Sequence, residues 1–233
     1  MLVVAISGLT SDGDDSTSAN EPNAPERPIA PGSQPSPGGD RGAAEPSGTE
    51  AQGEGIRQSL SRRRPVRAPD FSAELIHAGK LPRPLQKPFE RAAAKDSLDL
   101  SELGGTPVVL HLWSSKCAPC RADARLVEAT WKRWGPRGVL FVGANVKDSA
   151  DAARAVIRQY GLTYPGVSDR SGEIAERYGA TALPQTFFIS AGGDIVGEVA
   201  GSPSVRQLEV GASSAESGRT FGAEQGSSRV PLP

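Results

Sequence analysis

The sequence contains only two cysteines, two histidines and one methionine. One cysteine pair cannot replace a hydrophobic core in a chain of 233 residues, so a disulfide-rich mini-protein is excluded. The same count excludes a four-cysteine zinc site. No apolar run approaches the ~18 residues that a membrane-spanning helix needs. The formal net charge of −1 lacks the basic excess of a nucleic-acid-binding protein, so no nucleic-acid partner is expected.

Aromatic residues are scarce and unevenly distributed, since all six Phe, three Trp and three Tyr lie at or after Phe71. Residues 10–67 instead contain eight Gly and eight Pro. Such a segment cannot bury enough apolar surface to offset the entropy of ordering it, so we expect a disordered linker there. Residues 213–233 return to a Gly/Ser/Pro composition, and we expect a disordered tail. The folded domain is therefore assigned to residues 68–212.

The N-terminal residues 1–9, MLVVAISGL, resemble the end of a secretory signal or membrane anchor, although no basic segment precedes them. Residues 59–67 are basic, which fits either a contact with anionic lipid head groups or the solvated end of a linker. We expect an extracytoplasmic location, in the periplasm or on the outer face of the cytoplasmic membrane, with a membrane tether as one option.

Strands and helices are predicted to alternate through the second half of the chain. Apolar and β-branched runs predict strands over 106–113, 139–146, 185–190 and 195–200. Helices are predicted over 88–94, 118–134, 149–160, 172–178 and 204–210. This order predicts an α/β fold with a mixed central sheet flanked by helices, and the last two strands form a hairpin.

The two cysteines form one Cys-x-x-Cys motif between a predicted strand and the predicted helix that follows it. The first turn of a helix has free N–H groups and a partial positive charge, which stabilise a thiolate at Cys117. Lys116 adds a positive charge beside it, and Pro119 limits the spread of the pair. We therefore expect Cys117 to attack a disulfide. Cys120, one turn further on and more buried, should resolve the mixed disulfide.

Two other interpretations of the cysteine pair are open. The thiols could be incidental core residues, or they could form half of a zinc site shared between chains. Neither His77 nor His111 lies at ligand spacing from the pair, so no metal is expected.

Two titratable residues near the pair are candidates for proton transfer. His111 lies on the strand that leads to the cysteines, and it could exchange a proton with the resolving thiol or be a hydrogen-bonded core histidine. Asp123, one helical turn after Cys120, could accept a proton or be a solvated carboxylate on the helix surface.

A second motif follows in the chain, where Pro184 stands directly before an apolar strand, a position that suits a residue without an N–H. The segments WSSKCAPCRAD, YGATALPQTFFIS and GGDIVGEVAG together resemble the thioredoxin superfamily. They are most similar to its exported TlpA-like branch of thiol–disulfide oxidoreductases, which also begins with a segment of the APDF type. The resemblance covers about residues 68–210.

The resemblance implies a thioredoxin-like fold in which the Leu183–Pro184 peptide is cis and faces the disulfide. It implies that the Leu183 backbone pairs with an extended substrate strand, that Cys117 is the nucleophile and that Cys120 is the resolving thiol. The residues expected to bind substrate or support the site are Trp113, Lys116, Pro119, Leu183 and Pro184.

The chain also departs from the family pattern. His111 stands where many relatives have Asp or Asn, Asp123 where Glu is frequent, Lys116 where Trp is common and Arg125 where a helix-kinking Pro is common. The Ala-Pro pair between the cysteines lacks the His of strongly oxidising relatives, which favours a reductant over an oxidant.

We therefore expect a monomeric thiol–disulfide oxidoreductase that reduces disulfides of exported proteins and serves cell redox homeostasis. Its partners are disulfide-containing proteins and an upstream thiol reductant, and it needs no cofactor beyond its redox-active disulfide. One alternative is a peroxiredoxin-like thiol peroxidase: Ser114 fits that pattern, but Leu110 stands where the pattern requires Pro. The other is a non-catalytic thioredoxin-fold binding module.

Overall fold

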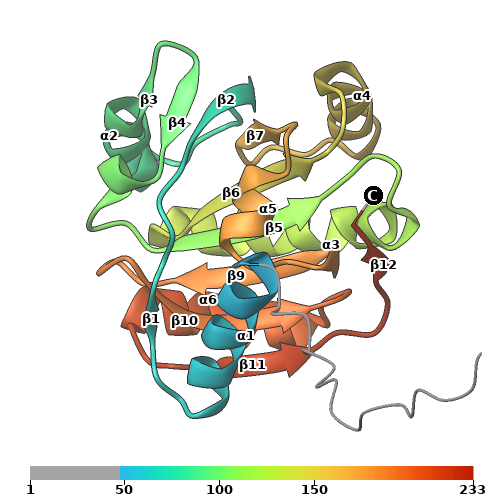
Figure 1. The fold of residues 1–233 in the computed structure, drawn as a ribbon. Coiled ribbons are helices and arrows are strands. Elements are labelled where there is room, and N and C mark those ends of the chain that lie inside the picture. Colours follow the sequence, from blue (N-terminus) through green and yellow to red (C-terminus); the bar gives the residue numbers. More distant parts are fainter. Residues whose placement is uncertain (1–47, 233) are drawn as a thin grey trace, which may run out of the picture. The chain divides into compact units, whose positions relative to one another are not determined.

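The computed structural model describes residues 48–232 of the chain (Figure 1). The interpretations of residues 1–9 and of residues 10–47 lie outside the described residues.

The described strands form a mixed sheet of ten strands and a separate two-stranded sheet. The strands of the large sheet are β1 Val66–Arg67, β2 Ser72–His77, β3 Ala93–Ala94, β4 Ser97–Asp99, β5 Val108–Trp113, β6 Leu140–Val146, β7 Gly166–Asp169, β9 Gln185–Ile189, β10 Asp194–Ala200 and β11 Gly222–Gln225. The small sheet pairs β8, Ala182–Leu183, with β12, Val230–Pro231. The order across the large sheet is β1-β10-β9-β5-β6-β7-β2-β4-β3, and β11 also pairs with β10.

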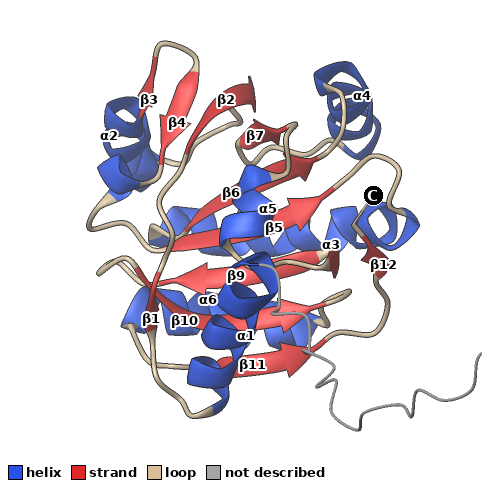
Figure 2. Cartoon of the chain, viewed as in Figure 1, coloured by secondary structure: helices blue, strands red, loops and turns tan. Residues whose placement is uncertain are grey.

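Helices cover both faces of this sheet (Figure 2). They are α1 Gly48–Ser61, α2 Arg83–Ala92, α3 Ala118–Trp134, α4 Ala150–Tyr160, α5 Glu173–Arg177 and α6 Val205–Ser217, with single 3-10 turns at Ser101–Leu103 and Gly135–Arg137. In Figure 1, α1 and α5 lie in front of the sheet, whereas α3 and α6 pack together behind it. The predicted α/β fold with a mixed sheet flanked by helices is confirmed.

The centre of the sheet is its most buried part. Every residue of β5 and β6 is buried, and the two strands are parallel neighbours. Strands covered on both faces read as continuous apolar runs, which is why VVLHLW and LFVGANV could be recognised in the sequence. Parallel neighbours end at the same edge of the sheet, so the loops after β5 and β6 lie together.

The strands before β5 were not predicted. Residues 72–105 contain several prolines, yet β2, β3 and β4 form one edge of the sheet there. The helix predicted over 88–94 is α2, but it begins earlier and ends earlier, because Pro84 is tolerated in its first turn, Pro88 lies inside it, and Ala93–Ala94 form β3.

The disorder predicted for residues 10–67 is wrong for its last part, where α1 forms. Ile56 and Leu60 lie four residues apart on one face of α1, and both are buried. Full burial of such side chains contributes roughly 1.5–3 kcal/mol each. Composition alone missed the helix because two well-spaced apolar residues are enough to attach it.

The disorder predicted for residues 213–233 is also wrong for the residues that the structure describes. Helix α6 continues to Ser217 and ends at Gly218, which is left-handed with φ 72°. Phe221 then packs edge-on against Phe188, with ring centroids 5.8 Å apart. A Cβ at Gly197 would stand 2.5 Å from the Phe221 ring, so that glycine makes room for it. The folded part therefore extends beyond the predicted boundary at residue 212.

Candidate active site

The cysteine pair lies at the start of α3. Cys117 is the N-cap residue and Cys120 lies in the first turn, and the two sulfurs form a disulfide. The Cys120 backbone N–H donates a hydrogen bond to Cys117 Sγ at 3.1 Å. The predicted placement at a strand-to-helix junction is confirmed, and one free N–H of the first turn binds the first sulfur.

Both cysteines are buried, each 3% exposed. The prediction that Cys120 is the more buried of the two is therefore wrong. Their positions in α3 still distinguish the two cysteines. Cys117, at the N-terminus of the helix, accepts the backbone N–H of Cys120, whereas Cys120 lies one turn further into the helix.

Asp148 organises the loop that precedes the pair. Its Oδ2 accepts hydrogen bonds from the Ser115 N–H at 2.6 Å, the Asn145 amide at 3.2 Å and the Ser114 hydroxyl at 3.3 Å. Burial alone would raise the pKa of the Asp148 carboxyl, but the hydrogen bonds it accepts, those from Ser115 first, hold that pKa below its usual value. The ionised carboxylate thus fixes the loop between β5 and the cysteines.

Asp148 was not among the residues expected at the site. A further signal was available in its position just after β6. Because parallel neighbours end at the same edge of a sheet, an Asp after β6 lies beside the loop after β5.

Pro184 lies at the same edge of the sheet, directly before β9, which is the other neighbour of β5. Leu112 of β5 pairs with Gln185 of β9, so Pro184 lies beside the end of β5, from which the chain leads to Cys117. The Leu183–Pro184 peptide is cis, as the resemblance implies, and both residues are buried.

His111 lies inside the sheet, where it is 2% exposed. Its Nδ1 lies 3.0 Å from the Thr186 hydroxyl on the paired strand β9. Burial lowers the pKa of His111 to about 4, so the imidazole is neutral at pH 7. These contacts are those of a hydrogen-bonded core histidine, and its role in proton transfer stays a prediction.

The burial of neutral His111 should make the protein acid-sensitive. The unfolded chain binds a proton near pH 6.5 and the folded chain only near pH 4, so the free energy of unfolding should decrease as the pH falls through this window. The expected loss is about 3 kcal/mol. Urea unfolding of the wild type and of His111→Asn at several pH values measures it, and the variant should lose most of the slope.

His77 provides the matched control for this experiment. Burial also lowers its pKa, but the side chain is only partly covered. His77→Gln should therefore remove a smaller part of the pH dependence than His111→Asn. An unchanged slope in His111→Asn would contradict the assignment of a buried neutral imidazole.

Asp123 is half-buried on α3, and its Oδ2 has no hydrogen-bond partner among the described residues. Burial raises the pKa of this carboxyl, and a hydrogen bond from Ser202 partly opposes the shift. A carboxyl with a raised pKa and an unused oxygen, one turn from Cys120, has the properties of a proton acceptor. That role stays a prediction.

The remaining candidates differ in exposure. Trp113 is buried, and a Cβ at Gly143 would stand 3.0 Å from its indole nitrogen, so the ring packs over that glycine. Lys116 is exposed, and Pro119 is half-buried in the first turn of α3. Trp113 thus packs within the sheet, while Lys116 is open to an approaching partner. Contact of these side chains with substrate stays a prediction.

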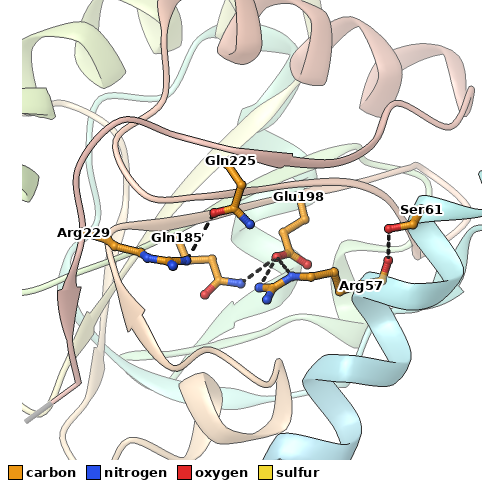
Figure 3. Close-up of polar contacts among 6 residues, drawn as sticks. All are labelled: Arg57, Ser61, Gln185, Glu198, Gln225 and Arg229. Carbon is orange, nitrogen blue, oxygen red and sulfur yellow. Dashed lines mark hydrogen bonds and ion pairs between the residues drawn. The ribbon is translucent and has the colours of Figure 1, made fainter.

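A polar cluster that the sequence analysis missed begins at Gln185, directly after Pro184 (Figure 3). Glu198 Oε1 accepts hydrogen bonds from Gln185 Nε2 at 3.1 Å and from Arg57 Nη2 at 2.7 Å. Burial raises the pKa of Glu198, and Arg57 opposes that shift. A buried carboxylate without a cation is costly, so Arg57 attaches α1 to β10, and Gln185 links the same carboxylate to the start of β9. The sequence signal for this buried cluster was a single Glu, Glu198, inside the mostly apolar segment GDIVGEVAG.

Among the described residues, no group of three or more His, Cys, Asp or Glu side chains is placed to hold a metal ion. No helix within residues 48–232 combines the length and apolar character needed to cross a membrane.

Residues 66–197 match the model of the AhpC/TSA family. Among curated proteins, the thiol-disulfide oxidoreductase ResA of Bacillus thuringiensis subsp. konkukian is 28% identical over 112 residues, which are 48% of this chain and 65% of the relative. ResA of Bacillus subtilis is 31% identical over 105 residues, 45% of this chain and 59% of the relative. The chain thus spans less than two thirds of the length of these relatives.

Solved structures show the same fold at low sequence identity. A thiol:disulfide interchange protein of the thioredoxin family from Chlorobium tepidum aligns with a TM-score of 0.52 at 22% identity, covering 65% of this chain and 97% of that one. A secreted disulfide oxidoreductase of Mycobacterium tuberculosis aligns with a TM-score of 0.50 at 21% identity, covering 67% and 98%. The thioredoxin-like fold that the sequence implies is confirmed.

Proposed function

The chain belongs to the AhpC/TSA family, and from this premise we propose that it is a thiol–disulfide oxidoreductase that reduces disulfides of exported proteins through Cys117 and Cys120. The observation that supports this most directly is the disulfide at the N-terminus of α3, on the sheet edge that also carries Pro184. The names of the ResA relatives agree with this chemistry.

The reaction begins from the dithiol. The Cys117 thiolate attacks one sulfur of the substrate disulfide, the other substrate sulfur leaves as a thiolate, and a mixed disulfide forms. Cys120 loses its proton and attacks Cys117 Sγ, which releases the second substrate thiolate. Two electrons pass to the substrate, and the Cys117–Cys120 disulfide of the structure is the oxidised product. An upstream thiol reductant returns it to the dithiol.

The geometry supports Cys117 as the attacking residue. Its sulfur already accepts the Cys120 N–H, and the positive end of α3 favours the thiolate over the thiol. Asp123 is the proposed acceptor for the Cys120 proton, because it lies one turn away with a free oxygen.

We propose that an extended segment of the substrate protein pairs with the backbone of Leu183. The edge of β8 accepts an antiparallel strand, and it lies next to Pro184 beside the cysteine loop. We further propose that the enzyme works as a monomer outside the cytoplasm. The location agrees with the structurally similar disulfide oxidoreductase of M. tuberculosis, which is a secreted protein.

An insulin assay with dithiothreitol as the reductant tests the proposed activity. The wild-type protein should accelerate insulin reduction well above dithiothreitol alone, and the reduction potential of its cysteine pair should lie nearer to about −270 mV, typical of a reductant, than to about −120 mV, typical of an oxidant. Rapid hydrogen peroxide consumption without insulin reduction would instead identify a peroxidase. Absence of both reactions would leave the binding-module interpretation.

A further inference from the structure

The last residues of the chain return to the candidate active site. Strand β11 ends at Gln225, parallel to β10, and the segment 226–232 leaves it, crosses the loop after β10 and ends as β12 (Figure 1). In β12, Val230 pairs with Leu183 and Pro231 with Ala182. We refer to residues 226–232 as the C-terminal strap.

Backbone hydrogen bonds hold the strap along its length. Gly226 N–H binds the Ala200 carbonyl at 2.8 Å, and Ser202 exchanges two bonds with the strap, accepting from Ser227 N–H at 2.9 Å and donating to the Ser228 carbonyl at 2.6 Å. At the end of the strap, Leu232 N–H binds the Thr181 carbonyl at 3.1 Å.

The crossing over the loop after β10 requires a glycine. A Cβ at Gly226 would stand 2.3 Å from the Ser202 carbonyl oxygen. The Ser202 side chain lowers the pKa of the Asp123 carboxyl against the rise that burial causes, so the strap lies on a loop next to the helix of the cysteine pair. Val230 and Leu232 pack against the hydrophobic core of the domain.

We propose that the strap occupies the strand-binding edge of Leu183 in place of substrate, so that it must leave before a substrate strand can pair there. This inference rests on the proposed function. The backbone groups along one edge of β8 can pair with one strand at a time, so strap and substrate exclude one another.

The contacts of the strap are few enough for it to leave the β8 edge and return. Its paired part is only two residues long, Pro231 has no N–H to donate, and the side chains of Ser227, Ser228 and Arg229 are exposed. The preceding strand β11 is fixed by four residue pairs with β10, so Gly226 marks the point where opening would begin. Segments with short pairing and exposed side chains open most readily.

Tethering explains how so short a strand competes with a protein substrate. A segment joined to the domain by a short linker acts at an effective concentration of the order of millimolar. If the strap is docked in about 90% of the molecules, about a tenth of them can bind a substrate strand. The apparent KM for substrate is then about tenfold higher than that of a protein with a free β8 edge.

Leu232→Asp in the full chain tests the proposal, because it places a charge where a half-buried leucine packs. The variant should lower the KM for insulin about tenfold with little change in kcat. It should also raise the rate at which iodoacetamide alkylates Cys117 in the reduced protein. Arg229→Ala is the matched control, since this exposed side chain of the same strap lies outside β12 and binds Gln225 (Figure 3), and it should behave as the wild type.

A second form of the protein, lacking residues 226–233, should reproduce both effects of Leu232→Asp. The synthetic peptide GSSRVPLP, which has the sequence of those residues, should then inhibit it competitively at millimolar concentrations. Unchanged KM and unchanged alkylation in both altered forms would overturn the proposal. If no form reduces insulin, the proposed function fails, and the alkylation rates alone decide whether the strap covers the site.

Discussion

Replacement of Cys117 by Ser is expected to lower the rate of insulin reduction by at least about a thousandfold, to the rate of dithiothreitol alone. A serine side chain contains no sulfur and cannot form the mixed disulfide, so the first step of the proposed reaction is removed. Serine is also a favoured N-cap residue, and its oxygen can accept the Cys120 N–H that Cys117 Sγ accepts now. The start of α3 should therefore persist, and the loss of rate reports chemistry rather than unfolding.

The measurement is insulin turnover at fixed dithiothreitol, together with the thermal melting of each reduced protein. Arg125→Ala is the matched control, because Arg125 is an exposed residue of the same helix without a proposed role. It should keep the wild-type rate. Full activity in Cys117→Ser would show that Cys117 is not the nucleophile.

The centre of the fold could be predicted because its signals are local. The helix predicted over 118–134 has those bounds in the structure, since strong helical spacing follows directly on an N-cap and a proline. Ser149 caps α4 by accepting the Ala152 N–H at 3.2 Å, as its position before an apolar periodic segment suggests. The cysteine site followed from the same local pattern.

The ends of the fold could not be predicted because they depend on distant partners. Arg57 is one charge in a Gly-rich segment until Glu198, 141 residues further on, gives it a buried partner. The strap is a Ser/Pro-rich sequence whose order comes from pairing with β8. The composition of a segment indicates how much apolar surface the segment can bury. It does not show which strand edges elsewhere in the fold are free to pair with that segment.

The candidate active site shows the same division between local and distant signals. The cysteines and Pro184 were identified from motifs, whereas Asp148 was not identified as part of the site. Its role depends on β5 and β6 being parallel neighbours, which brings the loop at Ser115 within 2.6 Å of its carboxylate. Equal burial of the two cysteines was also unexpected, and it leaves helix position and charge, without exposure, as the basis for assigning their roles.

The assignment of roles can be tested directly with Cys120→Ser. This variant keeps the backbone N–H that binds Cys117 Sγ but loses the thiol that resolves the mixed disulfide. When the reduced variant is mixed with insulin, a covalent adduct on Cys117 should therefore accumulate to nearly one insulin chain per protein, whereas the wild type should hold almost none. Non-reducing electrophoresis and mass spectrometry measure the adduct.

Cys117→Ser and the double variant Cys117→Ser/Cys120→Ser are the controls for trapping, and neither should retain insulin. The comparison is decisive because the two cysteines are equally buried, so accessibility alone would trap insulin on either one to a similar extent. The position at the N-terminus of α3, where the helix N–H and dipole stabilise the anion, and the adjacent Lys116 both favour Cys117. Stronger trapping in Cys117→Ser than in Cys120→Ser would reverse the roles and contradict the electrostatic argument on which the proposed reaction depends.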